Sequence, residues 1–392
     1  MLDIQFTTFF LDLEDLSIVN ITQNTLTVQL QAKLQVCPSC KQQTQKIHDY
    51  RLQKIKHLPL LHKSYELFLR KRRYVCPHCA KRFFEANSFL SKYQRMTDLL
   101  KQHIISQFSK MKTASTIAKE ANVSITTALR LFDHVSHPKP KLPEVLSIDE
   151  FKGNADGEKF QCLLTNPKDK TTLDVLENRK TDDLCKYFSS FPMEQRAQVR
   201  YVVMDLSSLF RYVIKSSLPN AKIVADKFHT CRLANWALES VRKQVQKEFS
   251  DHRRKYFKKS RYLLLTRYKN LKSDRDKEQL ANMLDVSEKL SHAYRLKELF
   301  YEVMDSSDSV EYVKRFKHWQ EEVMKYDMKQ FNKLLKTVIE WKNEIIAAIS
   351  TGFSNGYVEG CNNRTKVLKR ICYGIRKFKR MRNRILYLTH KN

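Results

Sequence analysis

The sequence predicts a multidomain α+β protein, and three features of the chain support this fold class. Short strand-like runs surround two cysteine pairs near the N-terminus, apolar runs alternate with helical segments between residues 144 and 226, and the remainder is almost wholly helical. Its 392 residues are enough for two to four compact units. Only 6 Gly and 9 Pro occur, which argues against a turn-rich sandwich or barrel.

The charge balance favours a polyanionic partner. Lys and Arg number 72 against 42 Asp and Glu, which gives a net charge of +30 (72 − 42). This surplus destabilises a compact chain through self-repulsion, but it suits nucleic acid, because neutralised phosphates release counterions. A generally basic protein without such a partner is the alternative. Neither a long apolar run for a membrane span nor a basic signal segment occurs, so we expect no membrane association and a cytoplasmic location.

Residues 1–90 are predicted to form a zinc-ribbon DNA-binding domain. Two Cys-x-x-Cys pairs lie 36 residues apart (76 − 40), and they comprise Cys37, Cys40, Cys76 and Cys79. Zinc prefers four thiolates in a tetrahedron, and each such turn supplies two, so we expect one structural zinc ion. A redox motif is the alternative, although redox pairs do not usually occur twice with basic flanks. Arg72 and Arg73, in the basic flank of the second pair, are candidate DNA contacts.

Residues 91–137 are predicted to form a helix-turn-helix DNA-binding domain. In the segment from Thr113 to Phe132, Ala118 is small where two helices would cross, and Asn122 tolerates the left-handed backbone of the turn. A hydroxyl at the start of the second helix would cap it. Ile125 and the predicted DNA contacts would then face a groove, and those contacts are Ser124, Thr126, Thr127 and Arg130. An ordinary helical hairpin is the alternative.

An α/β region follows the proline-rich linker His137–Pro143. Five apolar runs are predicted as strands: Val145–Ile148, Phe160–Leu164, Thr172–Leu176, Val199–Met204 and Lys222–Ala225. The helical segments Thr181–Phe191 and Ser207–Lys215 interrupt them.

Two of these strands end in aspartates, Asp149 and Asp205. In an RNase H-like sheet the two strands would be adjacent, and the carboxylates would lie side by side. Such a pair needs a cation to relieve its repulsion, and hard oxygen ligands select Mg²⁺ or Mn²⁺. Two such ions can activate water or a 3′-hydroxyl and stabilise the leaving oxygen. The alternative is that each aspartate is a solvated residue at the end of a strand.

Glu359 is the candidate third acid. Ser354 or Asn355 can cap its helix, which places Glu359 in the early turns. It lies 154 residues beyond Asp205 (359 − 205), and the helical residues 235–345 are interpreted as an insertion domain. On the residues alone, Glu344 is a rival for this role. From Arg364 to Asn392 there are eleven Lys or Arg and no acid, so the tail is predicted to follow phosphates through Lys369, Arg370, Arg376 and Lys377.

Four motif groups, taken together, resemble the ISL3 group of bacterial insertion-sequence transposases over nearly the whole chain. The first is the zinc-ribbon head, with His57–Pro59, Arg70–Arg73, Cys76–Cys79 and Phe84–Glu85. The others are Ile148–Phe151, Met204–Leu206 with Val224–His229, and Ser354–Gly356 followed by Glu359, Gly360, Asn362, Lys369, Arg370 and Gly374. The family more often has a polar residue near Leu206.

The resemblance implies an RNase H-like core, residues 138–234 and 346–392, interrupted by the helical domain at 235–345. It implies DDE-type transposition: Asp149, Asp205 and Glu359 would hold two Mg²⁺ (or Mn²⁺) ions and catalyse DNA strand cleavage and strand transfer. The expected partners are double-stranded DNA, as element terminal inverted repeats and target DNA, and further copies of the chain in a homodimer or higher assembly at the bacterial nucleoid.

Two questions stay open on the sequence. Asp226 and His229 either support the active site or form an ordinary helix N-cap with a packed histidine. The main functional alternative is a zinc-ribbon and helix-turn-helix regulator whose nuclease-like core is inactive. A site-specific nuclease without strand transfer is a further alternative, because it would use the same metal chemistry.

Overall fold

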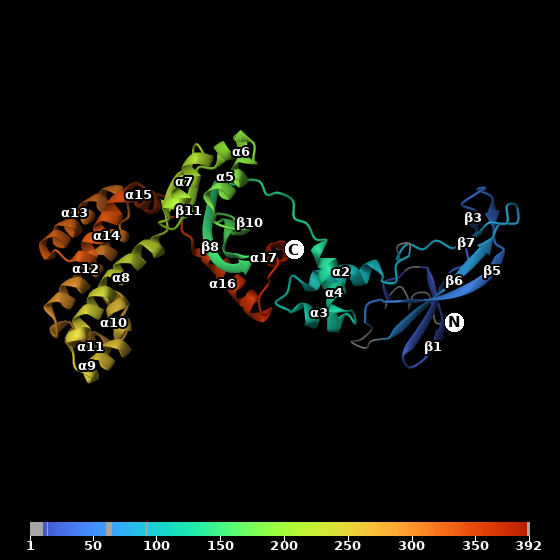
Figure 1. Cartoon of the computed structure of the whole chain (residues 1–392), viewed down its shortest axis with the longest axis horizontal. Helices are drawn as coiled ribbons and strands as arrows, with labels where there is room; N and C mark the ends of the chain where they lie inside the picture. Colours follow the sequence, from blue (N-terminus) through green and yellow to red (C-terminus); the bar gives the residue numbers. More distant parts are fainter. Residues whose placement is uncertain (1–10, 14, 60–64, 91–92, 390–392) are drawn as a thin grey trace. The chain divides into compact units, whose positions relative to one another are not determined.

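The computed structural model describes residues 11–13, 15–59, 65–90 and 93–389, and the chain divides into two compact units. The first unit draws on residues 1–137, 368–375 and 379–391, and the second on residues 138–367 and 376–378. Figure 1 gives the order of the elements, coloured from blue at the N-terminus to red at the C-terminus. The first unit therefore combines the two ends of the chain.

A five-stranded sheet forms the N-terminal part of the first unit. Its strands are β1 (Leu16–Ile21), β2 (Thr25–Leu30), β5 (Ile47–Ile55), β6 (Glu66–Val75) and β7 (Arg82–Phe84). The order is β1-β2-β6-β5 with β7 paired to β6, and only β2 and β6 run parallel. Alternating apolar residues along β2 and β6 bury Leu26, Val28, Leu67 and Leu69 in one cluster. A separate hairpin pairs β3 (Gln35–Val36) with β4 (Gln43–Thr44).

Four helices form the second part of this unit. Helices α2 (Asp98–Gln107), α3 (Ala114–Glu120) and α4 (Ile125–Asp133) come from the N-terminal segment, and α17 (Phe378–Thr389) comes from the C-terminal one. Tyr387 of α17 packs edge-on against Phe132 of α4, with ring centroids 5.9 Å apart. Arg384, which is buried, donates hydrogen bonds to the carbonyls of Phe108, Lys110 and Lys112. Helix α17 thus belongs to the helix-turn-helix cluster, whereas the sequence assigned it to the core of the second unit.

The second unit is built on a mixed sheet. Its strands are β8 (Val145–Ala155), β9 (Glu158–Asn166), β10 (Thr171–Leu176), β11 (Tyr201–Met204) and β12 (Lys222–Ala225), in the order β10-β9-β8-β11-β12. Strands β8, β9 and β10 are antiparallel neighbours, and β11 runs parallel to both β8 and β12. All five apolar runs predicted as strands are present. Helices α5 (Thr181–Ser189), α6 (Met193–Gln198) and α7 (Ser208–Ser217) interrupt them.

The two faces of this sheet are both covered, because successive side chains point to opposite sides. Leu146, Met204 and their neighbours share a cluster with Phe188 of α5 and Phe210 of α7. Val145, Val203 and Val224 lie in a second cluster with Ala348 and Phe353. Even-numbered residues of β8 therefore pack toward the cluster that contains Phe188 and Phe210. Odd-numbered residues pack toward the segment that contains Ala348 and Phe353.

Beyond β12 the second unit is helical. The elements are α8 (Lys227–Val245), η1 (Gln246–Glu248), α9 (Asp251–Lys259), α10 (Arg261–Leu265), η2 (Tyr268–Asn270), α11 (Asp274–Asp285), α12 (Glu288–Met304), α13 (Ser309–Tyr326), α14 (Lys329–Glu340), α15 (Lys342–Thr351) and α16 (Gly356–Ile371). Among the described residues, none of these helices combines the length and apolar character needed to cross a membrane.

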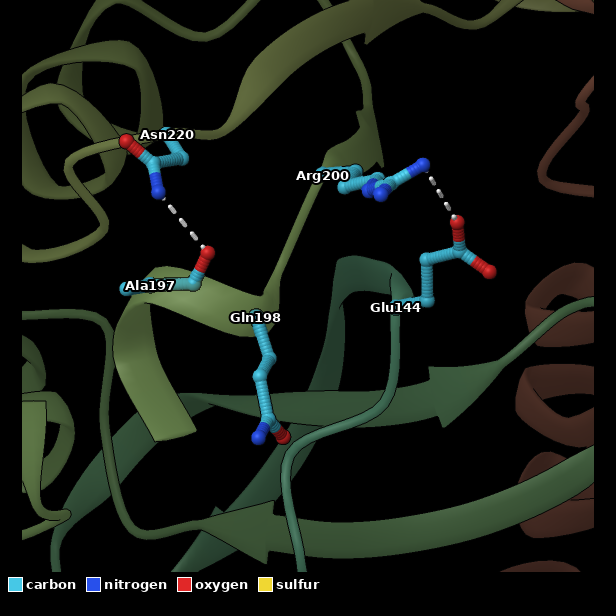
Figure 2. A pocket seen from close by; sticks show the side chains of 5 residues that line it. All are labelled: Glu144, Ala197, Gln198, Arg200 and Asn220. Carbon is cyan, nitrogen blue, oxygen red and sulfur yellow. Dashed lines mark hydrogen bonds and ion pairs between the residues drawn. The ribbon is translucent and has the colours of Figure 1, made fainter. Parts of the chain in front are cut away.

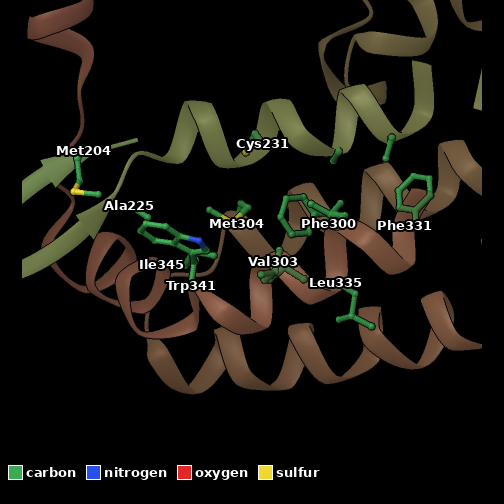
Figure 3. Close-up of a cluster of buried hydrophobic side chains, with 14 of the residues drawn as sticks. Met204, Ala225, Cys231, Phe300, Val303, Met304, Phe331, Leu335, Trp341 and Ile345 are labelled. Carbon is green, nitrogen blue, oxygen red and sulfur yellow. The ribbon is translucent and has the colours of Figure 1, made fainter. Parts of the chain in front are cut away.

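One hydrophobic cluster joins this helical region to the sheet. Figure 3 shows Trp341 and Ile345 beside Met204 and Ala225, the last residues of β11 and β12. The same cluster continues through α8, α12 and α14 by way of Cys231, Met304, Phe331 and other buried residues. The helical region and the sheet are therefore packed together as one unit, although the sequence predicted the helices as a domain of their own.

Candidate active site and metal centre

The candidate active site begins with a row of aspartates on three parallel strands. Asp205 and Asp226 directly follow β11 and β12, whereas Asp149, predicted to end its strand, lies within β8, which continues to Ala155. The parallel register pairs Tyr201 with Val145 and Lys222, and each of these residues is four positions before an aspartate. When this register is extended past the end of β11, Asp205 lies between Asp149 on one side and Asp226 on the other (201 + 4, 145 + 4, 222 + 4). Because every second residue of a strand points to the same face, all three side chains point to the face where Val145, Val203 and Val224 lie.

Asp149 is held by one donor on each carboxylate oxygen. Its Oδ1 accepts from the backbone N–H of Glu150 at 2.8 Å, and its Oδ2 accepts from Nδ2 of Asn362 at 2.8 Å. Burial and, to a lesser extent, the neighbouring charge of Asp205 raise the pKa of Asp149 to about 6, although the hydrogen bonds from Glu150 and Asn362 oppose the rise. A carboxylate has about four acceptor positions, so these two bonds leave lone pairs available for another ligand.

Asp205 is a half-buried carboxyl beside Asp149, and its Oδ1 atom is buried. Its Oδ1 has no hydrogen-bond partner among the described residues, which is unusual for a buried polar atom. Burial raises its pKa, Glu150 and Asp226 add to the rise, and His229 and Arg232 oppose it. The raised pKa values of Asp149 and Asp205 identify a place where negative charge is crowded and a cation would be stabilised.

Asp226 and His229 combine the two roles that the sequence left open. Asp226 is the N-cap of α8, and its Oδ2 accepts from the backbone N–H of His229 at 3.0 Å and from Nδ1 of the same ring at 2.7 Å. Its Oδ1 accepts from the backbone N–H of Asn355 at 3.1 Å. Burial raises the pKa of Asp226, but these hydrogen bonds outweigh it and lower that pKa. The bond to Asp226 raises the pKa of His229, and the protonated form of this ring lowers the pKa of both Asp149 and Asp205.

Glu359 lies in the first turn of α16 and is exposed. It lines a cavity of about 450 Å³ together with Asp226, Arg232 and Ser354. Among the described residues, only the four cysteines form a group of three or more side chains placed to hold a metal ion, so Asp149, Asp205 and Glu359 do not form such a group. The role of Glu359 as third acid remains a prediction.

Glu344, the rival third acid, is engaged elsewhere. It is buried on α15, and its Oε1 lies 2.9 Å from a guanidinium nitrogen of Arg211. Arg211 also stacks on Trp341, with its guanidinium carbon 3.5 Å from the ring centroid. Glu344 is thus part of a structural ion pair between α7 and α15.

The four predicted zinc ligands form one cluster. The Sγ atoms of Cys37 and Cys79 are 3.6 Å apart, those of Cys40 and Cys76 are 3.5 Å apart, and all four lie within 4.8 Å of one another. Four sulfurs at about 2.3 Å from one zinc ion would be separated by about 3.8 Å, so the spacing fits a tetrahedral site.

The two cysteine turns have the same backbone design. The N–H of Lys41 bonds to the carbonyl of Cys37 and that of Ala80 to the carbonyl of Cys76, and both donors have positive φ, 63° and 54°. Backbone N–H groups lower the pKa of Cys37 to about 6 and also lower that of Cys76. The backbone donors therefore favour the thiolate, the form that binds metal, at the first cysteine of each turn. At Cys40 the backbone donor is outweighed by burial and the neighbouring thiols, which raise the pKa of this thiol to about 12.

The helix-turn-helix has the predicted local features. Asn122 has φ of 50°, Ala118 is buried, and Ser124 caps α4 by accepting from the N–H of Thr127 at 3.1 Å. Thr126 and Arg130 are exposed on α4, and Thr127 is half-buried. These side chains remain predicted DNA contacts, with Ser124 committed to the cap as well.

The predicted basic contacts fall into two groups. Arg72 is 4% exposed, pairs with Glu85 at 3.0 Å and donates to the carbonyl of Leu30, so it is a structural residue of the sheet and the expectation that it contacts DNA is corrected. Arg73 pairs with Asp49 at 2.6 Å and is partly exposed. In the C-terminal segment Lys369 is half-buried, whereas Arg370, Arg376 and Lys377 are exposed and keep their predicted role.

An open pocket at the other end of the sheet is not part of this site. Figure 2 shows its lining residues Glu144, Ala197, Gln198, Arg200 and Asn220. Glu144 and Arg200 immediately precede β8 and β11, so the pocket lies at the amino ends of these strands, opposite Asp149 and Asp205. Its one lining ion pair, Glu144 with Arg200 at 3.5 Å, is exposed on both sides.

Two asparagines of the motif around Glu359 contact the site, although the sequence assigned neither of them a role beside the acids. Asn362 bonds directly to Asp149, and Asn355 receives a short hydrogen bond from the hydroxyl of Ser147. Asn362 is three residues after Glu359 and so lies on the same side of α16, a spacing that the sequence displays. This spacing alone does not identify Asn362 as functional, because an asparagine in a helix is more often a surface residue.

Comparison with known proteins supports a transposase. The model of a family described as "Transposase", DDE_Tnp_ISL3, matches residues 146–385. Two further models match, the "zinc-finger of transposase IS204/IS1001/IS1096/IS1165" at residues 33–79 and the "Helix-turn-helix domain of transposase family ISL3" at residues 85–136. The chain is 25% identical to the transposase for insertion sequence element IS1001 of Bordetella parapertussis over 365 residues, which is 90% of this chain and 88% of that protein. It is 24% identical to the transposase for IS1557 of Mycobacterium tuberculosis over 216 residues, 48% of each chain.

Proposed function

The chain belongs to the ISL3 family of transposases, and we propose that it cleaves and rejoins DNA by a DDE mechanism through Asp149, Asp205 and Glu359. The observation that carries the proposal is the parallel register of β8 and β11, which sets Asp149 and Asp205 side by side with raised pKa values. Two half-buried acids on adjacent strands repel each other when both are ionised, and a divalent cation between them would relieve that repulsion.

An RNase H-like core is the second part of the proposal. Its support is the strand order β10-β9-β8-β11-β12, in which three antiparallel strands are followed by two parallel ones, with α5 and α7 on one face. The helices between β12 and α16 would then be an insertion in that core. They lengthen the connection between the second and third acids while keeping both in one packed unit.

The residues present fit Mg²⁺ or Mn²⁺. The donors are hard carboxylate oxygens, Asp205 Oδ1 has no partner among the described residues, and each oxygen of Asp149 keeps a free lone pair. Two divalent cations held there would supply the charge that activates water or a 3′-hydroxyl and stabilises the leaving oxygen. Glu359 would complete the set, because an exposed side chain can change rotamer quickly and α16 already directs it to the same cavity as Asp226.

The other residues would position DNA and the acids. His229, held by Asp226, directs positive charge toward the aspartates, and Asp226 links the start of α8 to the start of α16 through Asn355. The zinc ribbon, with one structural zinc on four cysteines, and the exposed residues of α4 would bind the terminal inverted repeats of the element. The net charge of +30 suits double-stranded DNA at both the element ends and the target. Synapsis of two ends would require a homodimer or a higher assembly at the bacterial nucleoid.

The experiment is cleavage of a supercoiled plasmid that carries the two element ends, with Mg²⁺ supplied or withheld. Wild-type protein should nick at the ends and join the freed 3′-hydroxyl to a second DNA only when Mg²⁺ is present. Asp149→Asn, Asp205→Asn and Glu359→Gln should each lower cleavage by about 10³-fold or more while end binding is kept. Asp182→Asn, an exposed acid at the start of α5, is the matched control and should cleave normally.

Other outcomes have defined meanings. Full cleavage by any of the three variants would remove that acid from the catalytic set. End binding by wild-type protein without Mg²⁺-dependent cleavage would support a DNA-binding regulator instead. Cleavage without joining would support a site-specific nuclease.

A further inference from the structure

Asn362 is the one side chain that donates to Asp149 in the described part of the structure. The bond runs from its Nδ2 to Asp149 Oδ2 at 2.8 Å, while the other oxygen of the carboxylate is held by the backbone N–H of Glu150. A carboxylate held by one donor on each oxygen cannot rotate freely. Asn362 therefore fixes the plane of Asp149, which the backbone donor alone would not do.

Asn362 is itself fixed and only partly satisfied. It is 4% exposed, and its Oδ1 has no hydrogen-bond partner within the described residues. A buried amide that uses its donor and leaves its acceptor without a partner faces a ligand that the protein atoms do not provide. An aspartate at this position would add a third negative charge beside Asp149 and Asp205, whereas an amide orients Asp149 without that repulsion.

A second asparagine anchors the same helix two turns earlier. Asn355, 3% exposed, accepts a hydrogen bond from the hydroxyl of Ser147 on β8 and donates its backbone N–H to Asp226. Seven residues separate Asn355 from Asn362, so both lie on one side of α16, and Glu359 falls between them at i+4 from the first and i−3 from the second. The two contacts therefore set the height and the rotation of Glu359 relative to the strand that carries Asp149.

We propose that Asn362 is a positioning residue of the metal site, which orients Asp149 directly and, with Asn355, holds the helix of Glu359 in register with it. The inference rests on the proposed function, since it assigns a role within the same carboxylate site. It assigns a role to Asn362, which the motif around Glu359 contains but to which the sequence assigned no function. It also gives α16 a purpose beyond carrying the third acid: the helix brings an uncharged donor to the first one.

The test is a Mn²⁺ titration of the zinc-loaded, full-length protein, in which the electron paramagnetic resonance signal of free Mn²⁺ reports how much is bound. Plasmid cleavage is measured in parallel over the same range of Mn²⁺ concentrations. Asn362→Leu should weaken Mn²⁺ binding by about 10- to 100-fold and raise the Mn²⁺ concentration for half-maximal cleavage correspondingly. The matched control is Asn363→Leu, because Asn363 is the adjacent asparagine, is exposed, and bonds only to Lys366 in the contacts described for it. This control should leave both quantities unchanged.

A second variant separates positioning from a general loss of folding. Asn362→Asp replaces the amide by a carboxylate of the same size beside Asp149, so Mn²⁺ should raise its unfolding temperature more than that of the wild type. The inference is overturned if Asn362→Leu binds Mn²⁺ like wild type, or if Mn²⁺ stabilises Asn362→Asp no more than wild type. Asp149→Asn distinguishes this failure from failure of the proposed function: wild-type Mn²⁺ binding and cleavage by that variant would refute the carboxylate site itself.

Discussion

The cysteine cluster and the aspartate row are both candidate metal sites, but the chain builds them in opposite ways. Each half of the cysteine cluster is a turn of four residues closed by its own backbone hydrogen bonds, and sulfurs of the two turns lie 3.5 and 3.6 Å apart. The aspartate row requires three strands in register and a helix that begins 130 residues after Asp226 (356 − 226). A site made of local turns tolerates changes elsewhere in the chain, whereas a site made by register depends on many distant contacts.

The largest effect should follow from removal of a cysteine. Cys76→Ser leaves three thiolates, and structural zinc contributes about 10–16 kcal/mol of binding free energy in small zinc modules. Zinc content should fall from one per chain to near zero, and residues 35–44 and 75–84 should become accessible to protease. The second unit should keep its fold, because its sheet contains none of the four ligands. Mass spectrometry of metal content and limited proteolysis measure both effects.

Retention of one zinc ion by Cys76→Ser would contradict the cysteine site. Cys185→Ser is the control, since Cys185 lies on α5 outside the cluster and should leave the zinc content unchanged.

The next largest effect should occur in the helix-turn-helix, whose residues are close in sequence but are stabilised by Arg384 from the C-terminal helix α17. Arg384→Met removes a buried guanidinium that donates to the carbonyls of Phe108, Lys110 and Lys112, and a hydrogen bond from a charged donor contributes roughly 1.5–3 kcal/mol. The helix-turn-helix should lose about 3 kcal/mol or more, and binding to the element ends should weaken at temperatures where the wild type binds. Hydrogen exchange of α2 to α4 measures the stability. The same rates in Arg384→Met and in Lys379→Ala, an exposed control on the same helix, would show that α17 does not support the motif.

A smaller effect on stability, and one that depends on pH, should follow from substitution of Asp305, which pairs with the lysine next to Asp226. Asp305 pairs with Arg267 at 2.7 Å, Lys269 at 2.9 Å and Lys227 at 3.2 Å, and Lys227 follows Asp226 in the chain. Burial raises its pKa, but these cations outweigh it and hold the pKa well below its usual value. A lowered folded-state pKa means that the stabilisation is present above about pH 4, the unfolded value, and is lost as the pH falls further.

Asp305→Asn should therefore cost about 1–2 kcal/mol at pH 7, a modest value because two of the partner lysines are exposed. The difference from wild type should shrink as the pH falls below about 4. Urea unfolding at several pH values measures it. A difference that stays constant down to pH 2 would mean that the carboxylate charge is not the cause.

The smallest effect should come from the cap of α4. Ser124→Ala removes the acceptor for the N–H of Thr127 and should cost about 1 kcal/mol of helix-turn-helix stability. Ser124→Asp should retain most of it, because aspartate is an equally good N-cap. Thermal unfolding of the three proteins ranks them. Equal stability of the alanine and wild-type proteins would place the local determinants of this motif elsewhere in the turn.

Much of the fold was predictable because its signals are local. The five apolar runs of the α/β region became strands, Asn122 has the positive φ expected of its turn, and Ser124 and Asp226 cap their helices. The family, the zinc ribbon and the helix-turn-helix are confirmed by the comparisons. In each case neighbouring residues supply both the pattern and the interaction that stabilises it.

The failures concern residues whose partners are distant in the chain. Arg72 has the composition of a DNA contact, yet Glu85 and the carbonyl of Leu30 bury it in the sheet. The C-terminal tail was predicted to follow phosphates through Lys369, Arg370, Arg376 and Lys377, and that role stays a prediction. Arg384 and Tyr387 of the same tail, to which the sequence gave no separate role, pack in the helix-turn-helix cluster. Charge alone does not distinguish a guanidinium that binds phosphate from one that satisfies buried carbonyls, because both uses need the same donors.

The sequence by itself determined the local chemistry of this protein: two cysteine turns, a capped turn between two helices, and strands that end in acids. Only the tertiary structure decided which groups meet. It aligned Asp149, Asp205 and Asp226 through strand register, committed Glu344 to Arg211, and brought Asn362 to Asp149. The physical reason is that a turn or a cap is closed by hydrogen bonds between residues a few positions apart, whereas contacts across 200 residues exist only after the apolar faces of the sheet and helices have packed.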